Sequence, residues 1–258
     1  MSGPDTARLA LAEAIGTFGL VFGGTGAIVI YTVAGLQVTP LVFGIAFGLS
    51  GMIMIYAVGH ISGAHINPAV TIAFAATRNL PLRLVPVYIV SQLAGAIAAS
   101  AVFRALFGTP AHLGATLPRG SSLESLSMEV VLTFILMFVI MAVATDVRAV
   151  GQAAAIAIGA TIGLENVFAA PISGASMNPA RSLGPAIISN TWHGQWIDVV
   201  GPIVGALVAA LAYVYLRGPQ GTGAGATTPS QSVAAEARAA AHGEPHSNRP
   251  NRSNRRRR

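Results

Sequence analysis

The sequence predicts an all-α membrane protein with six transmembrane helices plus two re-entrant half-helices, arranged as an inverted repeat. Composition is the first observation behind this class. Hydrophobic residues make up 53% of the 258 residues and charged residues only 9%, whereas soluble domains carry about 25% charged residues. The second observation is a duplication: ISGAHINPAV at 61–70 returns almost unchanged as ISGASMNPAR at 172–181. A water-soluble surface is therefore excluded for most of the chain.

Charge and cysteine content narrow the function classes. The net charge of +6 comes largely from a C-terminal stretch that ends in the arginines 255–258. The charge therefore describes a tail and gives little support for nucleic-acid binding. The chain contains no cysteine, which excludes disulfides and cysteine metal sites. We expect no nucleic-acid partner and no cofactor.

Six segments are long and apolar enough to cross a bilayer, which requires about 20 mainly apolar residues. They are 9–31, 41–59, 82–104, 125–145, 149–168 and 198–217. Glycines recur within them, and we interpret these as helix-packing positions, because small residues let helices approach closely in lipid. The lipid bilayer is thus an expected partner of the chain.

The arginines of the connections predict the orientation. They alternate consistently onto one side, which the positive-inside rule assigns to the cytoplasm together with both termini. The opposite connections, 32–40 and 107–123, carry only Arg119. Because arginine replaces lysine throughout and alanine is abundant, we expect a GC-rich bacterial genome and a multi-pass protein of the plasma membrane. The arginines on the cytoplasmic side are Arg8, Arg78, Arg83, Arg148 and Arg217.

The duplication extends over two halves of three spans each. AEAIGTF at 12–18 resembles MEVVLTF at 128–134, and QLAGAIAASAV at 92–102 resembles PIVGALVAALA at 202–212. A repeat unit with an odd number of spans enters the membrane from opposite sides in its two copies, so a pseudo-two-fold axis lies in the membrane plane. We expect a channel domain over 1–218, built of repeat one (about 5–106) and repeat two (about 122–217). The Gly-, Ser-, Pro- and Arg-rich residues 219–258 predict a disordered cytoplasmic tail.

The duplicated segments predict two short helices. Asn67 and Asn178 each precede a proline, and asparagine is a preferred helix N-cap while proline is favoured at the first helical position. Helices over about 67–77 and 178–188 are too short to span a bilayer. They are therefore expected to enter from opposite faces and meet near the midplane, fed by irregular chain at 61–66 and 172–177. Such backbone is tolerated only inside protein or beside a wet cavity, which indicates a polar pore.

Two Asn-Pro-Ala motifs, each separated by two residues from a preceding Ser-Gly-Ala, resemble the signature of the aquaporin, or major intrinsic protein, family. The resemblance covers about 5–217 and is strongest to the nodulin-type branch of plants and its bacterial relatives. It implies an aquaporin-like fold and a homotetramer with one pore per subunit. It also implies passive passage of water and small uncharged solutes, exclusion of protons and ions, and no enzymatic activity. The motif residues are Asn67, Pro68, Ala69, Asn178, Pro179 and Ala180.

Four side chains in the motifs and spans have predicted roles. Each half-helix N-terminus carries about half a positive charge, which repels cations. The amides of Asn67 and Asn178 are expected to cap these helices through their oxygens and to keep their N–H groups free for a passing water. Glu13 and Glu129 lie inside spans, where an ionisable residue is costly. A proton relay is one interpretation, and the resemblance favours anchoring of the re-entrant loops.

The arginine at the end of the second copy predicts a selectivity filter. Arg181 stands where the first copy has Val70, so the asymmetry belongs to one mouth of the pore, the outer one in the orientation above. The resemblance places the other filter residues at Phe47, Asn166 and Ala175. Strict water channels usually have histidine on span five, where this chain has Asn166 or its neighbour Glu165. This difference predicts a wider aperture that admits glycerol and undissociated metalloid acids.

Rival readings remain open at this point. An ion-coupled secondary transporter also has inverted repeats and broken helices, and it would use Glu13, Glu129, Glu165 or Asp198 to bind its ion. An enzyme is disfavoured because no nucleophile elbow, zinc-helix motif or phosphate loop occurs in the sequence.

The histidines at 60 and 65 flank the first motif without a nearby carboxylate or cysteine. We therefore expect structural or pore-lining histidines, and no metal site, because the ligand count is too low.

Overall fold

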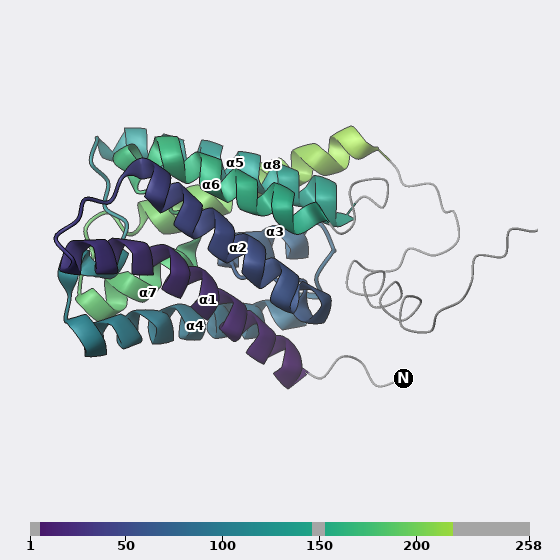
Figure 1. Cartoon of the computed structure of the whole chain (residues 1–258). Helices are drawn as coiled ribbons and strands as arrows, with labels where there is room; N and C mark the ends of the chain where they lie inside the picture. The colour runs from purple at the N-terminus through teal and green to yellow at the C-terminus, as the bar shows by residue number, and fades with distance from the viewer. Residues whose placement is uncertain (1–5, 146–152, 219–258) are drawn as a thin grey trace, which may run out of the picture.

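The computed structural model describes residues 6–145 and 153–218, and the regular elements there are helical (Figure 1). Six of these helices are long and apolar enough to cross a membrane, and two short ones follow the second and fifth of them. The long helices are α1 (Thr6–Val33), α2 (Pro40–Ser62), α4 (Val85–Phe107), α5 (Ser122–Thr145), α6 (Ala154–Ser173) and α8 (Ile197–Arg217), and the short ones are α3 (Pro68–Ala76) and α7 (Pro179–Ser189). The predicted class of all-α membrane protein is confirmed. The predicted tail, Arg148 and the predicted start of the fifth span lie outside the described residues.

The ends of α2 and α6 differ from the prediction. Both helices continue beyond the expected ends, to Ser62 and Ser173, and α6 does so through Pro171. Each stops at a glycine in the left-handed region, with φ of 88° at Gly63 and 89° at Gly174. Glycine adopts this conformation without a Cβ penalty, so it ends a helix where the chain must turn sharply. The irregular runs therefore begin at 63 and 174, not at 61 and 172.

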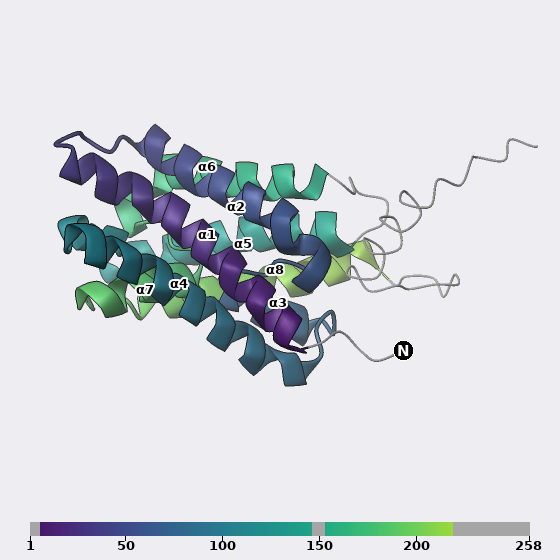
Figure 2. The ribbon, with the colours of Figure 1, turned by 60° about the horizontal axis from the view of Figure 1, so that its bottom comes forward.

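The two halves interlock through their short helices. Within the halves, α1 packs on α2 and α4, and α5 packs on α6 and α8. Across the halves, α2 packs on α6, α3 on α8, and α7 on α4. Figures 1 and 2 show α3 toward the end of the bundle that holds the start of α1 and the end of α8, with α7 toward the opposite end. The short helices thus enter the bundle from opposite ends, as the repeat predicts.

Helices α2 and α6, one from each half, pack with their backbones in close contact. A Cβ placed on Gly48 would lie 2.7 Å from the carbonyl oxygen of Gly159 and 2.9 Å from the Cα of Gly163. Such approach is available only to residues without a side chain, and it supplies the van der Waals contact that holds helices together in lipid.

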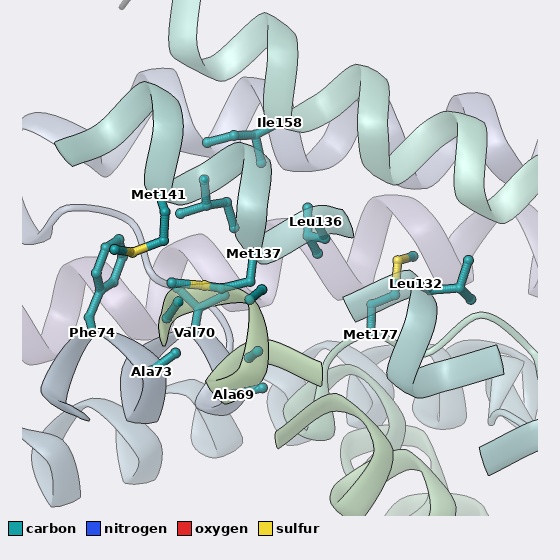
Figure 3. Packing of buried hydrophobic residues seen from close by; sticks show 14 of the residues in the cluster. Ala69, Val70, Ala73, Phe74, Leu132, Leu136, Met137, Met141, Ile158 and Met177 are labelled. Atoms are coloured by element: carbon teal, nitrogen blue, oxygen red, sulfur yellow. The ribbon is translucent and has the colours of Figure 1, made fainter. Parts of the chain in front are cut away.

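Apolar packing fixes α3 in its place. Val70 and Phe74 on α3 contact a buried cluster to which Met137 and Met141 on α5 belong (Figure 3). Val70 and Met137 are 2% and 0% exposed. Because methionine fills irregular gaps with a flexible chain, α5 covers one flank of the short helix and leaves its N-terminus aimed at the centre of the bundle.

Candidate functional site

The two runs that lead into α3 and α7 have the same unusual backbone. Ala64 and Ile66 have φ of 46° and 42°, and Ala175 and Met177 have φ of 46° and 53°. L-residues seldom adopt positive φ, and for a β-branched residue such as Ile66 it is a clear outlier. Strain of this kind persists only where surrounding contacts enforce it. The contacts that enforce it come from two buried carboxylates.

Glu13 on α1 receives four hydrogen bonds around the first run. Its Oε1 accepts from the Ser62 hydroxyl at 2.6 Å and from the His65 backbone N–H at 3.0 Å. Its Oε2 accepts from the Ile66 backbone N–H and from Gln92 Nε2, both at 2.7 Å. The carboxylate therefore satisfies backbone donors that the irregular chain cannot pair internally.

Glu129 on α5 makes three corresponding contacts around the second run, without a counterpart of the Gln92 bond. Its Oε1 accepts from the Ser173 hydroxyl at 2.6 Å and from the Ser176 N–H at 2.8 Å, and its Oε2 accepts from the Met177 N–H at 2.8 Å. Both glutamates are fully buried. These contacts are those that an anchoring role requires.

Asn67 and Asn178 cap the short helices and also tie the two runs together. Asn67 Oδ1 accepts from Ala69 N at 2.9 Å, and Asn178 Oδ1 accepts from Ala180 N at 3.0 Å. Asn67 Nδ2 donates to the carbonyl of Met177, and Asn178 Nδ2 donates to the carbonyl of Ile66, each at 2.8 Å. The expectation that the amide N–H groups stay free is thus only half right, because each amide uses one of its two hydrogens.

A small cavity lies where the two short helices meet. Its volume is about 30 Å³, which holds about two water molecules. Apolar side chains from α1, α5 and α6 complete the wall, so the polar groups face a narrow space with hydrophobic sides. The lining residues are Leu20, Phe47, Asn67, Leu136, Ile162, Asn166, Ser176, Met177, Asn178 and Arg181.

Arg181 occupies one side of this cavity, near the first turn of α7. Its side chain is 2% exposed, and Nη1 donates to the carbonyl of Gly114 at 2.9 Å. The guanidinium carbon lies 4.5 Å from the ring centroid of Phe47 and 5.9 Å from that of Phe43. A guanidinium over an aromatic face is attracted to the negative face of the ring. The Phe47 ring and the Gly114 carbonyl together fix the position of the Arg181 guanidinium.

The structure places the remaining filter candidates differently. Asn166 lines the cavity; its Nδ2 donates to the Ile162 carbonyl at 2.7 Å, while its buried Oδ1 has no partner among the described residues. Glu165 does not belong to the lining, and its two buried oxygens find no partner in the described part of the chain. Ala175 is buried in the apolar cluster and is not brought to the cavity with Phe47, Asn166 and Arg181.

His65 has an apolar setting. Its Nδ1 lies 3.2 Å from the Thr71 hydroxyl, and its ring packs 4.7 Å from that of Phe74 and 4.9 Å from that of Tyr88, measured between centroids. These contacts fit the first of the two expected roles, structural or pore-lining.

The connection between α4 and α5 supplies contacts that sequence reasoning missed. Thr116 donates its hydroxyl to Asp198 Oδ2, and its carbonyl accepts from Gln195 Nε2 at 2.7 Å. These bonds hold the segment whose Gly114 carbonyl receives Arg181. The one sequence signal was the charge of Asp198 at the start of an apolar span, which requires a buried partner.

Comparison with known proteins agrees with this arrangement. Residues 1–213 match the model of the major intrinsic protein family. The chain is 51% identical over 212 residues to Aquaporin NIP1-3 of Oryza sativa subsp. japonica, covering 82% of this chain and 74% of the relative. It is 48% identical over 221 residues to Nodulin-26 of Glycine max, covering 80% and 77%.

A solved structure resembles the whole fold as well. The aquaglyceroporin from Plasmodium falciparum superimposes with a TM-score of 0.71 at 25% identity, covering 81% of this chain and 96% of that one. The chain is therefore a membrane protein of the channel-forming class. It belongs to the major intrinsic protein family, and its likeness to NIP-type and nodulin-26 proteins matches the branch that the motifs predict.

Proposed function

We propose that the chain is a passive transmembrane channel for water and small uncharged solutes, with its constriction between the two half-helices. One observation carries this proposal: residues from both halves, among them Asn67, Asn178, Asn166 and Arg181, line one small cavity. Family members are channels and not enzymes, which agrees with the function and excludes the enzyme reading.

Exclusion of protons and cations follows from the same geometry. The N-termini of α3 and α7 converge, and each contributes about half a positive charge. Each capping asparagine retains one amide hydrogen after its bond to the opposite run. A water that accepts from both Asn67 and Asn178 has its lone pairs engaged and cannot pass a proton along the file. Arg181 adds a full positive charge on the same path.

Solute selection depends on the side chains nearest Arg181. We assign the filter to Phe47, Asn166 and Arg181, which line the cavity together, and we leave Ala175 outside it. An asparagine is shorter than the histidine of strict water channels, so the opening is wider. Glycerol and undissociated metalloid acids fit this character, and the structural likeness to an aquaglyceroporin supports it.

Assembly and location extend the proposal. Six apolar helices and the family establish a multi-pass membrane protein. We further infer a homotetramer in a bacterial plasma membrane, with both termini in the cytoplasm, from the family resemblance and the arginine pattern. The relatives named above are plant proteins, so the bacterial source rests on composition alone.

The rival coupled transporter requires a free ion-binding carboxylate. Glu13 and Glu129 are engaged by the re-entrant runs and Asp198 by Thr116, which leaves Glu165 as its candidate. Stopped-flow shrinkage of proteoliposomes separates the two functions, with protein-free liposomes as the control. A channel gives fast water flux with low activation energy that ignores ion gradients. Saturable uptake that depends on an ion gradient, and is lost in Glu165→Gln, would support the transporter.

Replacing Asn166 with histidine tests the filter assignment. The larger ring narrows the opening, so we expect glycerol flux to fall more than water flux in parallel swelling and shrinkage measurements. Glu165→Gln, one residue away and outside the lining, is the matched control and should leave the glycerol-to-water ratio unchanged. Equal loss of both fluxes in Asn166→His would show that Asn166 does not belong to the filter.

A further inference from the structure

A second, larger cavity opens beside the constriction. Its volume is about 400 Å³, and its walls come from the connection before α2, the connection between α4 and α5, and the last turn of α6. Arg181 lines both cavities, so the larger one is the vestibule of the smaller. The two connections lie at the end of the bundle away from the start of α1 and the end of α8, the side that the arginine pattern assigns to the outside.

Two arginines, Arg119 and Arg181, line the vestibule together with His112. Among the described residues no aspartate or glutamate lines it. The guanidinium of Arg119 makes no hydrogen bond within the described chain. Only the backbone N–H of Arg119 is engaged there, and it donates to the Ile172 carbonyl at 3.0 Å. Arg181 commits Nη1 to Gly114, and its buried Nε has no partner in the described part. Several guanidinium donors therefore remain for a ligand.

The nearest acids are engaged elsewhere. Asp198 accepts from Thr116, and Glu129 accepts from the run before α7. Glu124 caps the start of α5, with Oε2 accepting from the Ser121 N–H at 2.7 Å. His112 has its Nδ1 3.1 Å from the Thr191 hydroxyl, which leaves Nε2 for another partner. Nothing in this set pairs with Arg119.

We propose that this vestibule binds a small oxyanion, of the phosphate or carboxylate type, between Arg119 and Arg181. Guanidinium groups match planar and tetrahedral oxyanions with paired N–H donors. The volume suits a small ligand with its waters, since ligand pockets start near 300 Å³. We expect the bound anion to stay in the vestibule, held by the two guanidinium groups, and to obstruct the entrance to the constriction. This last step rests on the proposed channel function.

Calorimetric titration of the purified full-length protein with inorganic phosphate tests the site itself. Ionic strength is held constant with chloride, and Arg119→Gln is compared with Arg83→Gln, which changes an exposed arginine just before α4 that does not line the vestibule. We expect saturable binding that Arg119→Gln weakens by about tenfold or more, as loss of a charge-assisted pair implies, and that Arg83→Gln leaves unchanged. Absence of saturable binding, or equal binding in both variants, would overturn the site.

Water flux of the same proteins in liposomes tests the consequence. External phosphate should slow osmotic shrinkage relative to chloride at equal osmolality, and Arg119→Gln should keep its flux in chloride while losing the phosphate effect. Binding without slowing would overturn the obstruction while leaving the site. Failure of the proposed channel function would be seen separately. In that case neither the unaltered chain nor the variants would conduct water in chloride, although phosphate would still bind.

Discussion

At the scale of single residues, function arises where the two copies of the repeat differ. Val70 and Arg181 occupy equivalent positions, directly after their Asn-Pro-Ala motifs. Val70 is buried in the apolar cluster against α5, whereas Arg181 lines the constriction and lies over Phe47. The glutamates and asparagines, by contrast, make nearly the same contacts in both copies. The residues shared by both copies therefore build the same local structure in each half. The difference between Val70 and Arg181 makes the two sides of the constriction chemically unlike.

Arg181→Val, which makes the copies alike, should raise proton and cation leak. The variant removes a fixed positive charge and opens the cavity, so water flux should persist while discrimination falls. A pH-sensitive dye inside proteoliposomes reports the proton leak. The matched control is Arg104→Gln, since Arg104 donates to the Ile188 carbonyl and is exposed. Equal leak in both variants would show that Arg181 does not guard the path.

Glu129→Gln should destabilise the fold by about 1–3 kcal/mol, the cost of buried donors left unpaired. A glutamine amide offers one oxygen, so it cannot accept from Ser173, Ser176 and Met177 together. Unfolding of the purified protein in detergent measures the change. Glu13→Gln should behave alike, because its contacts are equivalent. Glu124→Gln, at an exposed helix start, is the control, and a Glu129→Gln midpoint no lower than that of Glu124→Gln would contradict the anchoring role.

At the scale of elements, the α2–α6 crossing depends on missing side chains. A methyl group on Gly48 meets the backbone of Gly159 and Gly163 at 2.7 and 2.9 Å, whereas one on Gly59 meets nothing nearer than 3.8 Å. Gly48→Ala should therefore cost about 1–3 kcal/mol, as overpacking does, and Gly59→Ala should be neutral or slightly stabilising. Thermal unfolding compares the two variants on one helix. Equal midpoints would mean that the helices separate easily at Gly48.

The short helices were predictable because their signals are local. Asn67 and Asn178, each followed by proline, place the start of α3 and α7 within one residue. The ends of α2 and α6 were harder to predict from local signals. In α6, for example, the helix continues through Pro171 because tertiary contacts hold its last turn. The cross-ties of the asparagines join residues 110 and 112 apart. No spacing rule predicts such a pairing.

The candidate filter was predictable only in part for a similar reason. Family resemblance located Phe47, Asn166 and Arg181, which the structure brings to one cavity. It did not reveal that Gly114 receives Arg181, or that Asp198 holds the segment through Thr116. These contacts depend on how the connection between α4 and α5 folds back over the bundle, and that segment has no motif of its own.

At the scale of the whole molecule, two half-helices from opposite ends complete one constriction that neither half forms alone. Each is held by a helix of the other half, α3 by α8 and α7 by α4. The ends of the described chain lie at one end of the bundle, and the connections that wall the vestibule, between α1 and α2 and between α4 and α5, lie at the other (Figure 1). The backbone of the molecule is therefore built of two similar halves, whereas the side chains at its two ends differ.

The absence of cysteine from the 258 residues permits the most direct measurement. A single cysteine replaces either Asn166, which lines the constriction, or Leu164, which is on the same helix and 66% exposed. Mercuric ion, which binds thiolates tightly, is added to proteoliposomes, and water flux is followed by stopped flow. We predict that mercury blocks Asn166→Cys and spares Leu164→Cys and the unaltered chain. Undiminished flux in Asn166→Cys after confirmed labelling would contradict a water path between the half-helices.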